Sequence, residues 1–321
     1  MPTLDSILIV TKRTALEELI LRFNTRSQAQ FYLEQQAQLN PAYTGGSFDE
    51  YQNAHDAYQA ALETLKKSLP RGVKHQVIER SFLPNFTFSG HDLVITLGPD
   101  GLVINTAKYL TTEPILALNP DAQRVDGILI PFSVAEARDW IDRAFAQRVS
   151  IKPISMAKAE LNDGQVLHAV NDLFIGARTH VSARYRIAFG RATENHSSSG
   201  IIVSTGAGST GWLQSIVTGA CRIAGGITHA DVAVPAPADY RLDWSSDTLY
   251  FAVREPFTSK TSQAGIVFGQ IGPREKLTLT SHMPENGVIF SDGIEADYLN
   301  FNSGSIVTIR LAERKAHLIV R

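Results

Sequence analysis

The chain has 321 residues, a length that favours two domains because a single hydrophobic core seldom grows beyond about 250–300 residues. Hydrophobic residues make up 44% and charged residues 19%, as in an ordinary folded protein. The formal net charge of −2 argues against nucleic-acid binding that is driven by the overall charge of the protein. The single cysteine, Cys221, leaves no partner for an intrachain disulfide and fits a reducing compartment, so we expect a cytoplasmic protein.

The first half of the chain predicts strands that alternate with helices. An apolar run at 7–10 predicts a strand, and it is too short to span a membrane and lacks a signal-peptide cleavage pattern. We expect a polar loop over 25–46, followed by a helix that begins at a capping box of Ser47 and Glu50. Further strands are predicted at 75–80, 92–98 and 114–119, and helices at 101–110 and 134–146, the last after a capping box of Ser133 and Glu136.

The second half predicts short antiparallel strands. Asn162-Asp163-Gly164 is a hairpin signal, only 212–223 looks helical, and a strand-like stretch begins at Asp231. We therefore predict an α/β domain with a parallel sheet over residues 1–146, and a mostly antiparallel, β-rich domain over 147–321.

The segment Gly98-Pro99-Asp100-Gly101 joins a predicted strand to a predicted helix. Such a turn places backbone N–H groups and a helix N-terminus at the carboxyl end of a parallel strand, where anions bind. Asp100 is unusual beside a phosphate site. It could take a proton from an attacking hydroxyl, hold Mg²⁺, or simply serve the turn.

A second glycine-rich turn, STGAGSTGW at 204–212, follows a strand in the β-rich half. Gly206-x-Gly208-x-x-Gly211 matches a dinucleotide-binding fingerprint by letter, but the hairpin context does not match. The hydrolase elbow around Ser209 is also disfavoured, because Ala207 replaces its first glycine. The remaining interpretations are a loop whose hydroxyls and Trp212 contact ribose, phosphate and base, or a tight turn with Trp212 in the core.

Other residues carry weaker signals. Asp292 with Gly293 is expected in a turn, Arg254 is a candidate phosphate contact at a strand end, and Cys221 is expected as a small core residue. The histidines show no metal-ligand spacing and are expected to face solvent or to hydrogen-bond; they include His168, His180, His196, His229 and His282.

The order of these segments resembles the NAD kinase family. GPDGL (98–102), AVNDLFIG (169–176) and STGAGSTGW (204–212) stand where that family carries GGDGT, an N-E pair and an STPTGSTAY-like loop. NDLFIG, the SSSG at 197–200 and AVREPF at 252–257 look closest to the mitochondrial-type branch. The resemblance implies the NAD kinase / diacylglycerol kinase-like fold, ATP as donor, NAD(H) as acceptor, Mg²⁺, and at least a homodimer with no membrane or nucleic-acid partner.

Carried over by position, the resemblance implies a role for each motif. Asp100 would take the proton from the NAD 2′-hydroxyl, and Gly98 and Gly101 would cradle phosphate. The dinucleotide would be bound by Asn171, Asp172, Ser209, Thr210, Gly211 and Trp212, with Trp212 in place of a base-stacking tyrosine.

The chain also departs from the family pattern. Pro99 removes a backbone N–H and Leu102 removes a hydroxyl, both on the donor side. Two alternatives to an active NAD kinase therefore stay open. The first is a nucleotide-binding protein of the same fold with impaired catalysis or a regulatory role, and the second is a related lipid or sugar kinase.

Overall fold

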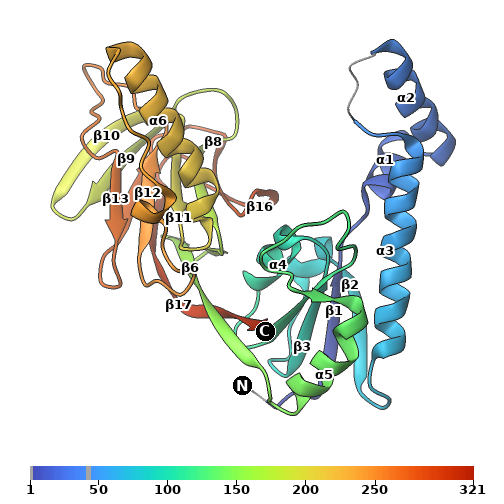
Figure 1. Cartoon of the computed structure of the whole chain (residues 1–321). Coiled ribbons are helices and arrows are strands. Elements are labelled where there is room, and N and C mark those ends of the chain that lie inside the picture. The colour runs from blue at the N-terminus through green and yellow to red at the C-terminus, as the bar shows by residue number, and fades with distance from the viewer. Residues whose placement is uncertain (1–2, 41–44) are drawn as a thin grey trace. The chain divides into compact units, whose positions relative to one another are not determined.

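The computed structural model describes residues 3–40 and 45–321. Contacts divide the described residues into two compact units (Figure 1). Unit 1 comprises the described residues of Met1–Thr106, Glu113–Ile151 and Leu318–Arg321, and unit 2 comprises Ala107–Thr112 and Lys152–His317. The chain therefore passes between the units more than once.

Unit 1 is built on a parallel sheet in the order β2 (Lys74–Glu79), β1 (Ser6–Thr11), β3 (Asp92–Leu97) and β4 (Pro114–Asn119). β4 also pairs with the short β5 (Phe132–Ser133) and with β17, whose last residues belong to this unit. Every residue of β3 is buried, as expected for a strand covered on both faces. The apolar runs at 7–10, 92–98 and 114–119 thus form strands as predicted.

The helices of this unit are α1 (Ala15–Phe23), α2 (Arg26–Leu39), α3 (Phe48–Ser68), α4 (Asp100–Ala107) and α5 (Ala137–Phe145), with 3₁₀ turns η1 (Arg80–Asn85) and η2 (Val134–Glu136). α2 packs on α1 and α3, where Leu33 meets Leu16 and Phe48. Tyr58, Ala61 and Leu65 of α3 pack in one core with β1 and β3, and Trp140 and Ile141 of α5 join it. Both predicted capping boxes, at Ser47–Glu50 and Ser133–Glu136, are present.

The loop predicted over 25–46 is wrong for its first part. Residues 26–39 form α2, capped by the hydroxyl of Thr25, which accepts from the N–H of Gln28. The helix buries only Ala29 and Leu33, while Phe31 is exposed, so the segment has too few apolar positions to produce a helical pattern. The predicted loop residues 41–44 lie outside the described residues.

Unit 2 contains two sheets whose inner faces share one core. The first runs β10 (Ala192–Ser198), β9 (Ala183–Phe189), β14 (Leu277–Ser281), β17 (Ile306–Val320), β6 (Ser150–Leu161), β7 (Val166–Ala169). The second runs β13 (Phe268–Ile271), β12 (Leu249–Val253), β11 (Ile201–Ser204), β8 (Asp172–Ala177), β15 (Gly287–Ser291), β16 (Ile294–Asn300). The pairs with a defined register are antiparallel, and the core takes Tyr185 and Leu277 from the first sheet and Ile201 and Phe251 from the second.

The predicted hairpin at 162–164 is confirmed, because β6 and β7 pair in antiparallel register on either side of it. Together the two units confirm the predicted fold class, an α/β part with a parallel sheet and an antiparallel β-rich part.

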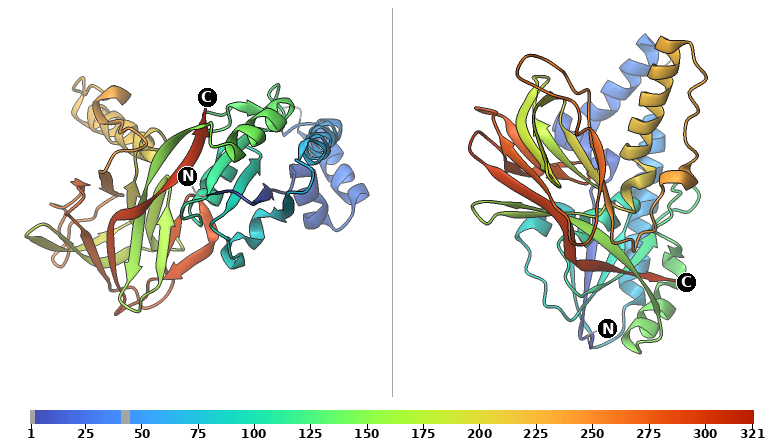
Figure 2. Two further views of the ribbon diagram at one scale, coloured as in Figure 1. Left: turned by 90° about the horizontal axis from the view of Figure 1, so that it is seen from below. Right: turned by 90° about the vertical axis from the view of Figure 1, so that its left-hand side faces the viewer.

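The helix α6 (Trp212–Thr228) lies on the second sheet at the face away from the shared core (Figure 2). Trp212, Leu213 and Ile216 pack there, whereas Ile223 and Ile227 further along are exposed. Cys221 on this helix is half-buried, so the prediction that it belongs to the core is wrong. No strand begins at Asp231, and the chain instead reaches the short α7 (Pro237–Tyr240).

Among the described residues, no helix combines the length and apolar character that crossing a membrane requires.

Leu65→Ala tests the core of unit 1. Leu65 is fully buried, so the substitution removes packed methyl groups and should lower the free energy of unfolding by about 2–5 kcal/mol. Leu39→Ala, at a position that is 75% exposed on α2, is the matched control and should change it by less than about 0.5 kcal/mol. Urea denaturation measures both, and equal effects of the two substitutions would contradict this packing.

Candidate functional site

A buried carboxylate holds the segment that contains Asn171 and Asp172. Oδ1 of Asp292 lies 2.7 Å from the N–H of Asn171, 3.1 Å from that of Val170 and 3.3 Å from that of Asp172. In return, the N–H of Asp292 donates to the carbonyl of Asp172 at 2.9 Å. Asp292 occupies the turn between β15 and β16 as predicted, but it also fixes the backbone at the start of β8, a role that the turn pattern did not indicate.

The glycine turn after β11 packs against the same segment. The N–H of Thr205 donates to the carbonyl of Asn171 at 2.9 Å, and the hydroxyl of Thr205 donates to the carbonyl of Val170. A side chain at Gly208 would place its Cβ 2.3 Å from the carbonyl oxygen of Asn171, so only glycine allows this approach. Two motifs more than thirty residues apart are therefore joined to the Asp292 turn. We call residues 170–172, 205–209 and 291–292 the three-segment cluster.

The side chains of the glycine turn differ in how far they are exposed. Ser209 is buried and donates to the carbonyl of Gly206 at 2.7 Å, so its hydroxyl shapes the turn. Thr210 and Gly211 are exposed where α6 begins, and Trp212 is half-buried. Thr210 and the backbone of Gly211 are therefore the parts of the turn that remain open to a ligand.

A buried lysine lies next to the three-segment cluster. Lys108 Nζ lies 2.7 Å from Asp297 Oδ2 and 3.0 Å from the hydroxyl of Ser291, and Tyr109 donates to Asp297. Lys108 also acts electrostatically on Asp292, lowering its pKa against the larger effect of burial. Lys108 and Asp297 thus form a charged support that sequence reasoning missed, because a single lysine near a helix end gives no signal of burial.

Burial raises the pKa of two neighbouring carboxyls. Desolvation, together with the nearby charge of Asp292, raises the pKa of Asp172 to about 7, while a hydrogen bond with Ser204 acts in the opposite direction. Desolvation raises the pKa of Asp292 to about 6, against the effect of its backbone N–H donors. Oδ1 of Asp172 is buried and has no hydrogen-bond partner among the described residues. Near neutral pH, Asp172 can therefore either donate or accept a hydrogen bond.

Trp212 borders a hollow of about 220 Å³ on the α6 side of the second sheet. Its ring lies parallel to that of Phe174, with centroids 6.0 Å apart, and the guanidinium of Arg254 lies 5.5 Å from its centroid. The lining also includes Arg178, Phe290, Glu295 and Tyr298. Of the two interpretations of Trp212, partial exposure at this hollow fits a contact with a planar group better than a core position.

The GPDG turn lies in unit 1, between β3 and α4. Both carboxylate oxygens of Asp100 accept backbone N–H groups at 3.0 Å, Oδ1 from Leu129 and Oδ2 from Ile128. This fixes the orientation of the carboxylate and leaves part of its accepting capacity free. Leu102 is buried, and its side chain occupies the space beside Gly98, so Leu102 faces the core of the unit. Gly101 is exposed in the first turn of α4.

The predicted residues thus fall into two groups, each within one unit. Asn171, Asp172 and the glycine turn meet within unit 2, and Gly98, Asp100 and Gly101 form the turn of unit 1. In the described part of the chain, no group of three or more His, Cys, Asp or Glu side chains is arranged to hold a metal ion.

The protein thus combines an α/β unit with an antiparallel β unit. In the antiparallel unit, a glycine turn packs against a segment that the carboxylate of Asp292 holds. The yeast NADH kinase, crystallised with NADH, has this fold, with a TM-score of 0.59 at 13% identity over 100% of this chain and 84% of the yeast chain.

Two curated proteins with similar sequences are NAD kinases. The NAD kinase of Prosthecochloris aestuarii is 27% identical over 177 residues, which are 51% of this chain and 61% of the relative. That of Chlorobium phaeobacteroides is 29% identical over 129 residues, or 39% of this chain and 44% of the relative. The chain thus spans 44–61% of the length of these curated relatives, and no family model matches it. These similarities support a relationship with the NAD kinase family.

Asp172→Asn tests the buried carboxyl. In the folded protein the pKa of Asp172 is raised to about 7 from the ordinary value of 3.8. The wild-type protein therefore loses stability as the pH rises from 3.8 to about 7, because the folded state resists ionisation of this carboxyl. The amide of the Asp172→Asn variant does not titrate. The free energy of unfolding of this variant should therefore exceed that of wild type by near zero at pH 4 and by roughly 1–4 kcal/mol at pH 8. Urea denaturation across this range measures it. An advantage that shrinks as the pH rises would contradict the assignment.

Proposed function

We propose that the chain is an NAD kinase that transfers the γ-phosphoryl group of ATP to the 2′-hydroxyl of the NAD adenosine ribose. The observation that carries the proposal is the three-segment cluster, in which Asp292 and Thr205 hold Asn171 and Asp172 against the glycine turn. This arrangement offers amide and carboxyl groups beside an exposed hydroxyl, which suits the hydroxyls and amide of a dinucleotide.

Within this proposal, Asp100 takes the proton of the attacking 2′-hydroxyl. The oxygen then forms a bond to the γ-phosphorus while the bond to the β-phosphate oxygen breaks, leaving NADP and ADP. Two backbone N–H donors already fix the orientation of the carboxylate, and positioning is the main requirement of phosphoryl transfer. Gly101, in the first turn of α4, provides a backbone N–H group on the phosphate side. Gly98 donates its own N–H to the carbonyl of Leu118, so its part in the proposal is to let phosphate approach the backbone.

The other groups follow from the same proposal. Trp212 stacks on a base, and Arg254 beside its ring supplies positive charge near phosphate. Asp100, which has accepting capacity left, would hold the Mg²⁺ that comes with ATP, and the ion would offset the charge of the phosphates during transfer.

A homodimer is part of the proposal. On the outer part of α6, Ile223 is 65% exposed and Ile227 is 75% exposed, and a second copy of the chain would cover both side chains. The NDLFIG, SSSG and AVREPF segments favour the mitochondrial-type branch.

A second candidate is a nucleotide-binding protein of this fold that does not transfer phosphate. Pro99 has no N–H to donate at the GPDG turn, and Leu102 is buried where the family has a hydroxyl. Both changes lie on the donor side and leave the three-segment cluster untouched.

An enzymatic assay separates the two candidates. Purified protein with NAD, ATP and Mg²⁺ should form NADP, detected with an NADP-specific dehydrogenase. Asp100→Asn should lower the rate at least about 100-fold, because it removes the general base, while NAD affinity changes little. Asp139→Asn, on the exposed side of α5, is the matched control and should leave the rate unchanged.

NAD binding without NADP formation, with either ATP or polyphosphate as donor, would overturn the first candidate and support the second. In that case Pro99→Gly, which restores the backbone N–H, tests whether proline is the cause.

A further inference from the structure

A second polar hollow lies along the edge strand β10, and it shares no lining residue with the three-segment cluster or the Trp212 hollow. Its volume is about 430 Å³, and an adjoining hollow of about 580 Å³ shares Asn195 and His282 with it. Both sizes suit a small molecule. Three structural parts enclose them, namely the outer face of β9, the edge of β10 and the loop at 257–263.

Unpaired cations line these hollows. Arg184 and Arg186 are exposed at alternate positions of β9, so they project from the same face of the sheet, opposite Ser197 and Asn195 in register. Within residues 3–40 and 45–321, neither guanidinium has an ion-pair or hydrogen-bond partner. His282 follows β14 beside Arg184, donating its backbone N–H to the Arg184 carbonyl at 2.9 Å.

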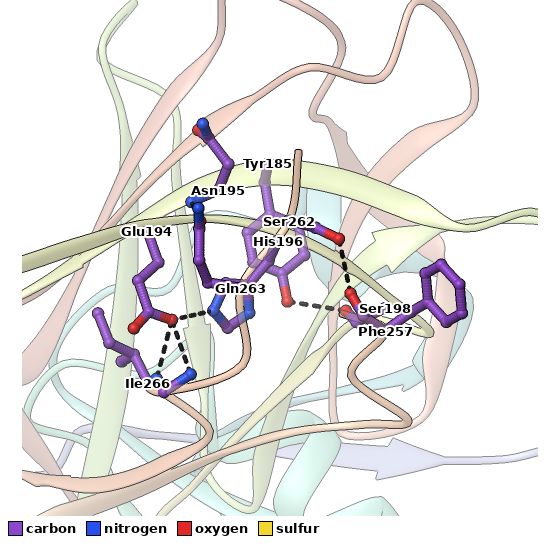
Figure 3. A network of polar contacts seen from close by, with 10 residues as sticks. Tyr185, Glu194, Asn195, His196, Ser198, Phe257, Ser262, Gln263 and Ile266 are labelled. Carbon is purple, nitrogen blue, oxygen red and sulfur yellow. Dashed lines mark hydrogen bonds and ion pairs between the residues drawn. The ribbon is translucent and has the colours of Figure 1, made fainter. Parts of the chain in front are cut away.

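A buried histidine provides an independent indication. His196 is 3% exposed and lines the first hollow. Its Nε2 lies 2.9 Å from Glu194 Oε2, the same oxygen that accepts the N–H groups of Gly265 and Ile266 (Figure 3). The hydrogen bond from His196 lowers the pKa of Glu194, so Glu194 is ionised and Nε2 carries the proton.

The other ring nitrogen of His196, Nδ1, is buried and has no hydrogen-bond partner among the described residues. Buried polar atoms are nearly always paired, so an unpaired one on a residue that lines a hollow points to a ligand. With the proton on Nε2, Nδ1 is an acceptor, and the P–OH group of a monoprotonated phosphate would donate to it. The negative charge of Glu194 repels an anionic ligand, but the three hydrogen-bond donors at its Oε2 offset part of that charge.

The loop opposite the arginines adds hydroxyl groups. It is fixed to β10 by two backbone hydrogen bonds of 2.8 Å, from Phe257 to Ser197 and from Gln263 to Asn195. Ser262 donates to the carbonyl of Phe257 at 2.7 Å, and its oxygen lies 2.8 Å from that of Ser259 (Figure 3 shows the first of these). The hydroxyls at the hollow are thus held in place by the loop.

We propose that this hollow binds a phosphate group, either free phosphate or the monoester of a small metabolite. The guanidinium groups of Arg184 and Arg186 and the imidazole of His282 line the hollows. The hydroxyls of Ser197 and Thr261 lie in the same lining, and this set of donors suits a phosphate oxyanion. The ligand is recognised by its phosphate, because the only aromatic side chain in the lining is that of the exposed Phe257.

Isothermal titration calorimetry with inorganic phosphate, and separately with ribose 5-phosphate, tests the site. Wild-type protein should show saturable binding, and Arg184→Gln should weaken it at least about tenfold by removing a charge-assisted donor. Arg191→Gln is the matched control: it removes the same charge from the β9–β10 turn, outside the hollow, and should change the affinity by less than about twofold. Tighter binding of the ester than of phosphate would assign the site to a phosphorylated metabolite, and the reverse would assign it to free phosphate.

Nitrogen NMR of the histidine rings gives a second readout that does not depend on activity. The Nδ1 resonance of His196 should shift on phosphate addition in wild type and in Arg191→Gln, and much less in Arg184→Gln at the same concentration. Absence of saturable binding would overturn the proposal. Equal affinity of the two arginine variants would overturn it as well, because phosphate would then be bound elsewhere, as at the proposed nucleotide site.

Discussion

The arrangement of unit 2 around its candidate site depends on the carboxylate of Asp292. Three consecutive backbone N–H groups, of Val170, Asn171 and Asp172, point at its oxygens, where the chain leaves β7 and enters β8 at Asp172. Without an acceptor, these groups would be part-buried donors with no partner, each costing up to about 1–3 kcal/mol. The carboxylate therefore determines the path of the chain between the two strands.

The other features of the three-segment cluster follow from that path. The carbonyls of Val170 and Asn171 are turned toward Thr205, which closes the glycine turn onto them, and Gly208 fits only because it has no side chain. Two acidic groups, Asp172 and Asp292, then lie close together in a desolvated environment, and Lys108 offsets part of the charge of Asp292. A site that must bind sugar hydroxyls benefits from a carboxyl whose pKa of about 7 lets it donate as well as accept.

Sequence patterns predicted the parts of the fold that depend on local periodicity. β3 is apolar throughout and covered on both faces, and the capping boxes at Ser47 and Ser133 mark helix starts by side-chain chemistry alone. α2 was missed because only Ala29 and Leu33 are buried on it. The motifs at 171–172 and 204–212 predicted two segments that contact each other within unit 2, but not the residues that support them. Asp292 has the sequence signature of an ordinary turn, and Lys108 that of a solvent-facing lysine, and their roles depend on contacts between residues more than 100 positions apart.

Hydrogen exchange with and without NAD is the most direct test of the claim that the three-segment cluster binds the dinucleotide. If the cluster binds the dinucleotide, saturating NAD should slow amide exchange by about tenfold or more in residues 169–176 and 204–212, because the ligand suppresses opening of the backbone that Asp292 and Thr205 hold. Exchange in the β9–β10 hairpin, residues 183–198, should change less. NAD binding that leaves 169–176 and 204–212 unprotected would contradict the account.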